Sequence, residues 1–491
     1  MKIAIRADAS IETGSGHVMR CLALAEALRD RGGKIGFVSR ERKGNLSDLV
    51  EARGFRVARI PETPDDGWEH DASLTLSALK DWGMVEWLIV DHYGIDARWE
   101  SELRNSAKRI MVIDDLADRV HDCDLLLDQN LQGGTEDRYK DLVPPQCIRL
   151  LGPKYALLRP EFARIRETLR MRDGKVRRIL VFFGGSDPSN ETAKALEAIQ
   201  LLDRPDIAID LVVGSSNPRR DEVKQICESL PNAAFHCQAG NMAELMAEAD
   251  ISIGAGGSAM WERCALGLPT LVVCVAENQL SGSTAMAEKG CILYLGKSSE
   301  VNAALLRSAL EVACASPHLL INMGRANDQL ADGRGANRIA DRLVQKPIAL
   351  REATQKDCDS LYHWRNDEES RRFSSNPDSI LYENHVEWYK NAMNDPDRLI
   401  LIGETDHAPA GVVRFDREDS RAVISVYLVP GKMGKGLGTR LIEEGVRWIE
   451  GRWPVKTIDA LIDTRNHASI AAFEKAGFLE RQCIYSKTVR A

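Results

Sequence analysis

Three features that would narrow the function at once are missing from this sequence: a long apolar run, a paired-cysteine motif and an excess of positive charge. No run approaches the ~20 apolar residues that cross a bilayer. The apolar start of the chain is ended by Arg6, which makes it too short for a signal peptide. We therefore expect a cytoplasmic protein with no membrane partner.

The cysteines and the charges exclude further classes. The 11 cysteines are odd in number and include no Cys-x-x-Cys pair, so neither a zinc site nor a disulfide framework is indicated. A net charge of −8 does not attract nucleic acid. With 44% hydrophobic and 28% charged residues, the composition is that of a globular protein. A chain of 491 residues is long enough for about three domains.

Short apolar runs alternate with helical patterns over the first two-thirds of the chain. The runs fall at 2–6, 35–38, 87–90, 110–113 and 125–127, and then at 178–183, 209–213, 251–253 and 271–275. This alternation is typical of parallel sheets with helices on both faces. We expect an α/β fold of two Rossmann-like lobes, residues 1–153 and 154–343, that face each other across a cleft.

A different pattern begins after the segment Val344-Gln-Lys-Pro347. A helix is predicted at 357–365, and the runs that predict strands fall at 348–353, 399–404, 411–415 and 422–429. Strands with few helices between them indicate an antiparallel α+β module. Its extent, 348–491, is about the size of one domain.

The turn Gly14-Ser15-Gly16-His17 links the first strand to a helix predicted to reach about Arg31. Glycines in such a turn let backbone N–H groups approach a ligand closely. His17 falls in the first turn of the helix, where the positive helix end disfavours imidazolium. A neutral imidazole at the mouth of a cleft suits a general base that activates water. An ordinary turn followed by a helix-start histidine explains the motif equally well.

A second glycine turn, Gly254-Ala-Gly256-Gly257-Ser258, follows a strand and opens a helix predicted at 259–266. This arrangement forms an anion-binding nest for a phosphate or a pyrophosphate. Glu262 lies one helical turn further on, where it can accept hydrogen bonds from ribose hydroxyls. The pair Asn278-Gln279 follows the next strand, at the edge where ligands bind in open α/β sheets. The alternative is that these glycines serve packing alone.

These motifs resemble known enzymes. Gly-Gly-Ser-x-x-x-Glu, Gly-Leu-Pro and then Asn-Gln are similar to the donor lobe of glycosyltransferases of the B fold. Over about residues 1–343 the chain resembles the UDP-2,4-diacetamido-2,4,6-trideoxy-β-L-altropyranose hydrolases of pseudaminic acid synthesis more closely. The motifs that carry this resemblance are Asp8, Gly14-Ser-Gly-His17-x-x-Arg20-Cys21, Asp91-His-Tyr93, Ile113-Asp-Asp115 and Asp128-Gln-Asn130.

The resemblance implies that His17 is the catalytic residue, that water replaces the acceptor sugar, and that no metal is needed. Water then attacks the anomeric carbon and UDP leaves. Asp114 and Asp115 are interpreted as capping residues outside the site. The UDP-sugar ligands are predicted to be Asp8, Gly14, Gly16, Asp91, Tyr93, Gly256, Gly257, Ser258, Glu262, Asn278 and Gln279.

The last module contains a third glycine turn, between Met433 and Thr439, that precedes a helix predicted at 440–448. Together with the Asn466…Gly477-Phe478 segment, this turn resembles the GNAT acyltransferases over about residues 348–491. The resemblance implies acetyl-CoA as co-substrate. Its predicted ligands are Leu428, Val429, Gly434, Lys435, Gly436, Leu437, Gly438, Thr439 and Asn466.

This module departs from the GNAT pattern at two positions. Met433 stands where the family usually has Gln or Arg, so backbone amides must make more of the hydrogen bonds to the pyrophosphate. Phe473 replaces a tyrosine that often acts as general acid, so Tyr427, Tyr485 or water must protonate the leaving thiolate. His385 is either a sugar contact or a histidine on the surface of a helix, and no catalytic base is assigned.

The hydrolase-like part and the GNAT-like module would catalyse two consecutive steps of one pathway. We expect a bifunctional enzyme that acetylates the 4-amino group of a UDP-sugar and then hydrolyses the UDP bond. One alternative is a glycosyltransferase of the B fold fused to an acetyltransferase of unrelated substrate. Another is a regulatory nucleotide-sugar-binding protein whose acetyltransferase modifies proteins. The expected partners are a small-molecule UDP-sugar and acetyl-CoA.

Overall fold

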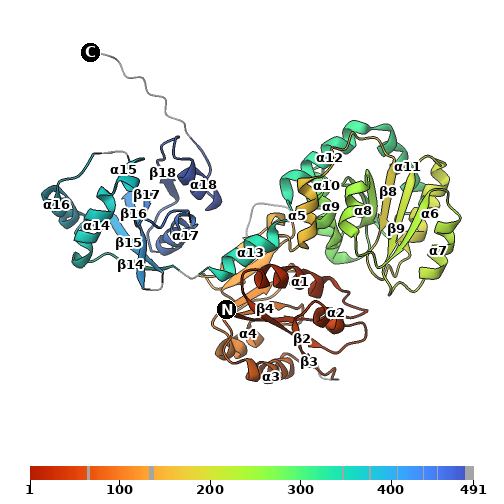
Figure 1. The fold of residues 1–491 in the computed structure, drawn as a ribbon, viewed down its shortest axis with the longest axis horizontal. Helices are drawn as coiled ribbons and strands as arrows, with labels where there is room; N and C mark the ends of the chain where they lie inside the picture. The colour runs from red at the N-terminus through yellow and green to blue at the C-terminus, as the bar shows by residue number, and fades with distance from the viewer. Residues whose placement is uncertain are drawn as a thin grey trace, which may run out of the picture. The chain divides into compact units, whose positions relative to one another are not determined.

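The chain folds into two compact units, Met1–Val344 and Gln345–Ala491, which are shown in Figure 1. The computed structural model describes residues 1–63, 67–131, 138–345, 348–374, 378–405, 407–434, 436–450 and 452–481.

The first lobe of the first unit is built on a parallel sheet with the strand order β3-β2-β1-β4-β5-β6-β7. Its central strands are buried apolar runs, as the sequence predicts. The strands are β1 (Lys2–Ala7), β2 (Lys34–Arg40), β3 (Arg56–Ile60), β4 (Trp87–Asp91), β5 (Ile110–Ile113), β6 (Leu125–Asp128) and β7 (Ile148–Leu151).

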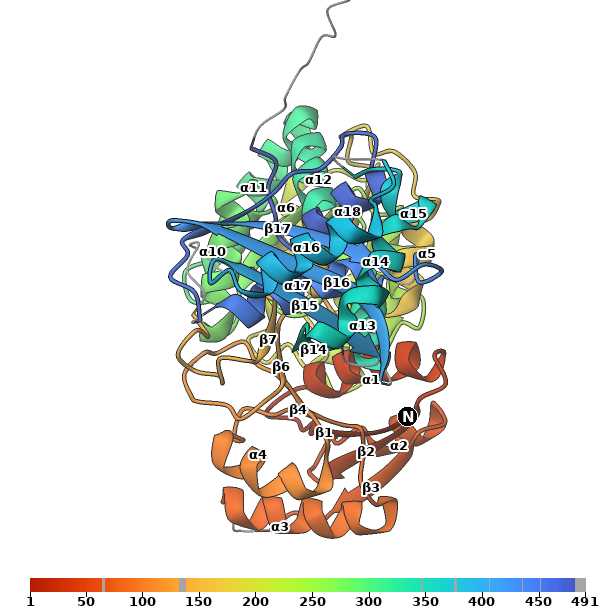
Figure 2. The same ribbon diagram turned by 90° about the vertical axis from the view of Figure 1, so that its left-hand side faces the viewer.

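Helices cover both faces of this sheet because its side chains alternate between two apolar cores. Ile3 and Ile5 of β1 pack in the core with α1 (Gly16–Arg29), whereas Ala4 packs in the opposite core with α3 (Trp68–Leu79) and α4 (Ala97–Leu103). Figure 2 shows α3 and α4 on one side of β1–β4 and α1 on the other. A short helix, α2 (Ser47–Ala52), precedes β3.

The second lobe repeats this plan with a parallel sheet in the order β10-β9-β8-β11-β12-β13. Its strands are β8 (Arg178–Phe182), β9 (Ala208–Val213), β10 (Ala233–Cys237), β11 (Ile251–Ala255), β12 (Thr270–Cys274) and β13 (Leu293–Lys297). Its helices are α6 (Glu191–Leu202), α7 (Arg220–Glu228), α8 (Met242–Glu248), α9 (Ala259–Ala265), α10 (Leu280–Glu288), α11 (Ala303–Ala315) and α12 (Pro317–Leu330).

The two lobes are joined by a linker and by a returning helix. The linker enters the second lobe through α5 (Pro160–Glu167). The final helix, α13 (Gly335–Val344), packs against α1 in the core of the first lobe, and Trp87 Nε1 donates to the carbonyl of Leu343 at 3.0 Å. The sequence-based limit of the second lobe at residue 343 therefore differs from the packing, because α13 presents its apolar face to the first lobe.

The second unit is built on a sheet in the order β14-β15-β16-β17-β18, antiparallel except for the pair β17–β18. Helices α14 and α16 lie against one face and α17 and α18 against the other (Figure 1). The strands are β14 (Ala349–Glu352), β15 (Arg398–Thr405), β16 (Ala408–Glu418), β17 (Arg421–Leu428) and β18 (Thr457–Ala460). The helices are α14 (Cys358–Asn366), α15 (Glu368–Arg371), α16 (Tyr382–Met393), α17 (Leu437–Ile449) and α18 (His467–Lys475).

The predicted fold class, α/β lobes followed by an α+β module, is confirmed. In the described part of the chain, no single helix is long and apolar enough to cross a membrane. One helix pair bent by 94°, Ala303–Ala315 with Pro317–Val344, passes that test by length and composition only.

Candidate functional site

His17 lies in the first turn of α1 and is held there by a carboxylate from the end of β4. Its Nδ1 is 2.5 Å from Oδ1 of Asp91. Arg20, one helical turn further along α1, donates to both oxygens of Asp91, each at 2.6 Å. The Asp91 side chain is fully buried, and that of His17 is 10% exposed. Asp91 thus positions both α1 side chains, and it does not face the solvent as a sugar ligand would.

The charge on Asp91 fixes which nitrogen of His17 carries the proton. Burial alone raises the pKa of Asp91, but the positive charge of Arg20 and the hydrogen bonds from Arg20 and His17 outweigh it and bring that pKa well below its usual range. An ionised carboxylate only accepts hydrogen bonds, so the proton of neutral His17 sits on Nδ1. His17 Nε2 is then left as a proton acceptor, which is the geometry of a general base oriented by a carboxylate.

Tyr93 and Asp115 lie beside this pair. The Tyr93 ring meets the His17 ring edge-on with 4.6 Å between centroids, and burial together with Asp115 raises the pKa of the Tyr93 phenol. Asp115 Oδ2 is also 3.3 Å from Arg20 Nη1. From the sequence, Asp115 was interpreted as a capping residue outside the site. Its place just after β5, next to β4 in the sheet, is the signal that could have included it.

Asp8, predicted as a sugar ligand, belongs instead to a buried ion-pair network. Arg6 donates to Asp8 Oδ2 at 2.9 Å and to Asp71 Oδ2 at 2.6 Å, and the backbone N–H of Arg40 donates to Asp8 Oδ1 at 2.8 Å. Burial raises the pKa of Asp8, but Arg6 and His92 outweigh it and hold that pKa well below its usual range. The network joins the end of β1 to the end of β2. The predicted sugar contact of Asp8 therefore has no support in this geometry.

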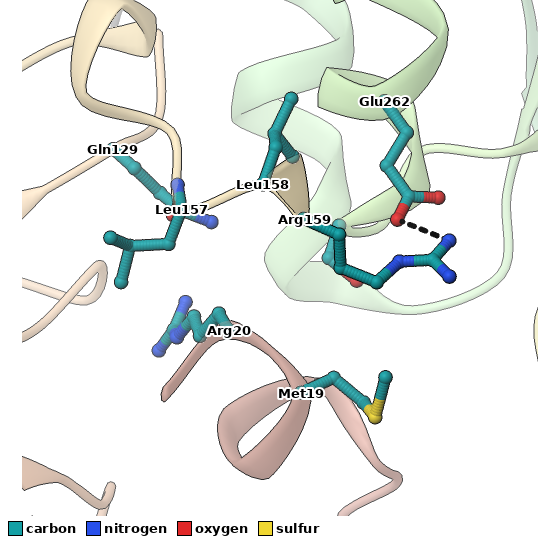
Figure 3. A pocket seen from close by; sticks show the side chains of 9 residues that line it. Met19, Arg20, Gln129, Leu157, Leu158, Arg159 and Glu262 are labelled. Atoms are coloured by element: carbon teal, nitrogen blue, oxygen red, sulfur yellow. Dashed lines mark hydrogen bonds and ion pairs between the residues drawn. The ribbon is translucent and has the colours of Figure 1, made fainter. Parts of the chain in front are cut away.

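The glycine turn of the first lobe lies next to the glycine nest of the second. A Cβ added to Gly16 would stand 3.9 Å from Ser258 Oγ, and Gly14 has φ +77°, which favours glycine. Ser258 precedes α9, so the positive ends of α1 and α9 both border one pocket. Further lining side chains are those of Met19, Arg20, Gln129, Leu157, Leu158, Arg159 and Glu262 (Figure 3).

Glu262 and Arg159 form an ion pair at this pocket, with Nη2 of Arg159 3.4 Å from Oε1 of Glu262 (Figure 3). Burial raises the pKa of Glu262, and Arg159 opposes that shift. Arg159 and Arg20 place two guanidinium groups beside the nest, and neither residue was predicted as a ligand from the sequence. The Glu262 carboxylate can accept hydrogen bonds from hydroxyl groups. The two guanidinium groups and the backbone amides of the nest can bind an anion.

The remaining second-lobe predictions fall around the same nest. A Cβ added to Gly256 would stand 2.3 Å from Ser283 Oγ, whereas one added to Gly257 would have Gln279 Nε2 as its nearest neighbour, at 3.5 Å. Gly256 is therefore required by packing, and Gly257 is open enough to admit a ligand. Asn278 is exposed in the short turn that precedes α10, outside the side chains that line the pocket.

In the second unit, β17 and β18 pair only as far as Ile424 and Ala460. Beyond this point, among the described residues, β17 continues to Leu428 without a partner on that side. The glycine turn follows at once, with φ +77° at Gly434 and +69° at Gly436, and leads into α17. A Cβ added to Gly434 or Gly438 would meet no atom within 4 Å. An open strand edge and an uncovered helix N-terminus fit a pantetheine arm and a pyrophosphate.

The other residues of this unit that the sequence singled out lie away from this glycine turn or outside the described part of the chain. Asn466 caps α18 by accepting a hydrogen bond from the N–H of Ser469 at 3.0 Å. Phe473 is buried against Phe478. His385 is 3% exposed, and its Nε2 lies 3.0 Å from the carbonyl of Cys358. It is therefore buried, and neither the surface position nor the sugar contact predicted for it agrees with this structure. Lys435 and Tyr485 lie outside the described residues.

Comparison with known proteins assigns the class. Residues 179–339 match the glycosyltransferase family 28 C-terminal domain, and residues 348–479 match the acetyltransferase (GNAT) domain. MurG of Acinetobacter baumannii shares the fold of the first unit, with a TM-score of 0.51 over 70% of this chain and 99% of that one, at 14% identity. The chain thus combines a segment similar to the glycosyltransferase family 28 C-terminal domain, within a unit that has the fold of MurG, with a GNAT acetyltransferase domain.

Three relatives narrow the class. An uncharacterized protein of Methanocaldococcus jannaschii is 26% identical over 97% of this chain and 96% of its own length, so it spans both units. The spore coat polysaccharide biosynthesis protein SpsG of Bacillus subtilis is 28% identical over 69% of this chain and 96% of its own. The UDP-2,4-diacetamido-2,4,6-trideoxy-β-L-altropyranose hydrolase of Campylobacter jejuni is 28% identical over 59% of this chain and 97% of its own. The similarity to this hydrolase confirms the resemblance drawn from the motifs.

Proposed function

We propose that this protein is a bifunctional sugar-nucleotide enzyme. The first unit hydrolyses UDP from UDP-2,4-diacetamido-2,4,6-trideoxy-β-L-altropyranose, and the second transfers acetyl from acetyl-CoA to the 4-amino group of the preceding UDP-amino sugar. Both steps belong to pseudaminic acid synthesis. The observation that carries the hydrolase is that Gly16, the residue before the carboxylate-oriented His17, lines one pocket together with Ser258 of the glycine nest.

In the hydrolytic step, His17 Nε2 takes a proton from water while the water oxygen attacks the anomeric carbon. The bond between that carbon and the diphosphate oxygen breaks, and UDP leaves with the bonding electrons. Asp91 stabilises the imidazolium as it forms, because its carboxylate already accepts the Nδ1 proton.

The departing diphosphate is stabilised where its charge develops. The amides of Gly257 and Ser258 at the start of α9 face it, and Arg159 and Arg20 add two guanidinium groups to the same pocket. Glu262 accepts ribose hydroxyls once its ion pair with Arg159 loosens. Water replaces an acceptor sugar at His17.

The nest makes a prediction about UDP binding. Gly257→Val should weaken UDP affinity by about tenfold or more, since losing about 1.4 kcal/mol of binding costs that factor. The added side chain has room in the fold but occupies the ligand's path. Isothermal titration with UDP measures this, with Gly240→Val as the control because a Cβ added to Gly240 meets no atom within 4 Å. Unchanged UDP affinity in a folded Gly257→Val protein would place the nucleotide elsewhere.

In the acetyl-transfer step, the acceptor amine forms a C–N bond to the thioester carbonyl carbon, the C–S bond breaks, and the amine proton passes to solvent. Gly434, Gly436 and the N-terminus of α17 would hold the pyrophosphate of acetyl-CoA. Leu428 and Val429 would offer backbone groups to the pantetheine arm at the unpaired end of β17.

Gly438→Val separates the two activities. Gly438 lies in the first turn of α17 with no atom within 4 Å of an added Cβ, so the variant folds while its side chain blocks the turn. We expect KM for acetyl-CoA to rise by about tenfold or more, with UDP release unchanged. A normal acetyl-CoA KM in thiol-release assays would remove this turn from the co-substrate site.

The two units should also function apart, because each has its own apolar cores. A fragment of residues 1–345, which keeps α13, should release UDP and ignore acetyl-CoA. A fragment of residues 346–491 should consume acetyl-CoA with a UDP-4-amino sugar and leave the UDP bond intact. Circular dichroism and the two assays test this, and an unfolded first fragment would contradict the independence of the units.

A further inference from the structure

The segment Asp128-Gln129-Asn130 lies at the end of β6, and the proposed reaction gives it no role. Asp128 Oδ1 accepts the N–H of Asn130 at 2.9 Å, which fixes the turn. Gln129 accepts the N–H of Leu157, in the linker, at 3.0 Å, and both residues line the pocket beside the nest (Figure 3). Asn130 Oδ1 accepts the indole N–H of Trp261, from α9 of the second lobe, at 2.9 Å. The segment thus joins the first lobe to the linker and to the helix that follows the nest.

Trp261 connects α9 to Asn130 through this hydrogen bond. It lies three residues after Ser258 and directly before Glu262, so it belongs to the helix of the nest. Its side chain is 1% exposed and packs in the apolar core of the second lobe. An indole N–H can only donate, and a buried one usually finds a partner. Because the Asn130 carbonyl oxygen is that partner, the NH₂ group of Asn130 is left for the first lobe.

The NH₂ group of Asn130 contacts the residues that hold His17. Asn130 Nδ2 donates to Asp115 Oδ2 at 3.4 Å, and Arg20 Nη1 donates to the same oxygen at 3.3 Å. Arg20 also donates to both oxygens of Asp91, which accepts the Nδ1 proton of His17. Hydrogen bonds therefore connect the nest helix to the base. We call this series the interlobe link, and it runs through Trp261, Asn130, Asp115, Arg20, Asp91 and His17.

We propose that Asn130 is a positioning residue that sets the distance between the base on α1 and the nest on α9. This inference rests on the proposed hydrolysis, in which a water at His17 and a diphosphate at the nest must both reach one anomeric carbon. A misplacement of about 1 Å can cost about 10²-fold in rate. One amide offers an acceptor and a donor, so Asn130 serves the N–H of Trp261 in one lobe and the carboxylate of Asp115 in the other. Aspartate at this place would keep the acceptor but would set a second carboxylate against Asp115.

Two single substitutions in the full-length chain cut the interlobe link at different points. Trp261→Phe keeps an aromatic ring in the core but removes the N–H, and Asn130→Asp keeps the oxygen for Trp261 but removes the NH₂ group. Release of UDP from UDP-2,4-diacetamido-2,4,6-trideoxy-β-L-altropyranose measures catalysis, and calorimetric UDP binding measures the nest. We expect each variant to lower kcat by about tenfold, the effect of losing one hydrogen bond, with UDP affinity unchanged. Because both act through one link, the double variant should be no slower than the slower single variant.

Trp87→Phe is the matched control for the loss of a buried indole N–H. Trp87 is 3% exposed, and its Nε1 donates to the carbonyl of Leu343 at 3.0 Å. This variant therefore loses a comparable hydrogen bond outside the interlobe link. Its kcat should equal that of the unaltered chain.

Asn130 is half-buried and aspartate has nearly the same shape, so Asn130→Asp tests the link even if Trp261→Phe fails to fold. A normal kcat in folded Asn130→Asp protein would overturn the positioning role and leave the hydrolase standing. Losses that multiply in the double variant would do the same, as would a loss of UDP affinity as large as the loss of kcat. Absence of UDP release by the unaltered chain would overturn the hydrolase itself, and the positioning role with it.

Discussion

Replacing His17 by alanine should lower the rate of UDP release by about 10²–10⁴-fold, the usual effect of removing a general base. UDP affinity should change little, because the nest lies at α9 and the histidine at α1. Steady-state UDP release and calorimetric UDP binding, measured on the same preparation, separate the two effects.

His318→Ala is the control for this variant, since His318 is exposed on α12 away from the pocket. Its rate should equal that of the unaltered chain. A folded His17→Ala protein with a near-normal rate would exclude His17 as the base and leave the nest without a catalytic partner.

Asp91→Asn should also lower kcat strongly, by roughly 10²–10⁴-fold, because it moves the imidazole proton from Nδ1 to Nε2. The asparagine NH₂ can donate to His17 Nδ1 at the position now occupied by the carboxylate. The proton of His17 then moves to Nε2, and the atom that faces the water can no longer accept one.

Asp91 is also the buried counter-charge of Arg20, so loss of stability must be separated from loss of catalysis. The double variant His17→Ala, Asp91→Asn makes this separation. If Asp91 acts through His17, the second substitution costs no further rate in the alanine background. An additional, multiplicative loss there would assign Asp91 a separate role. Thermal unfolding of all variants confirms that each is folded at the assay temperature.

The central strands of both lobes could be predicted from the sequence because they are continuous apolar runs buried on both faces. The strands that apolar runs did not predict are β3, β7, β10 and β13, which stand at the edges of their sheets. Edge strands are half exposed and carry charged residues, as in Arg-Val-Ala-Arg-Ile of β3. The return of α13 to the first lobe could not be predicted, since periodicity shows that a face is apolar but not what covers it.

In the candidate site, too, the features set by local sequence could be predicted, and those set by contacts between distant residues could not. Glycine turns next to helix starts indicated His17 and Ser258, because the chemistry of those positions is local. The partnership of His17 with Asp91 joins residues 74 positions apart, and no spacing rule predicts it. Asp91 therefore appeared as a sugar ligand, and Asp115 as a capping residue, until the ends of β4 and β5 placed both beside α1. The network around Asp8 also depends on distant residues, because Asp8 shares Arg6 with Asp71 of α3, 65 positions from Arg6.

The most direct test of the central claim is UDP release from UDP-2,4-diacetamido-2,4,6-trideoxy-β-L-altropyranose in ¹⁸O-labelled water, with no acceptor sugar present. Attack of water at the anomeric carbon predicts rapid UDP release with the label in the sugar and none in UDP, lost in the His17→Ala variant. Absence of UDP release until an acceptor sugar is added would identify a glycosyltransferase. Label found in the released nucleotide would show attack at phosphorus, and either result would contradict the hydrolase.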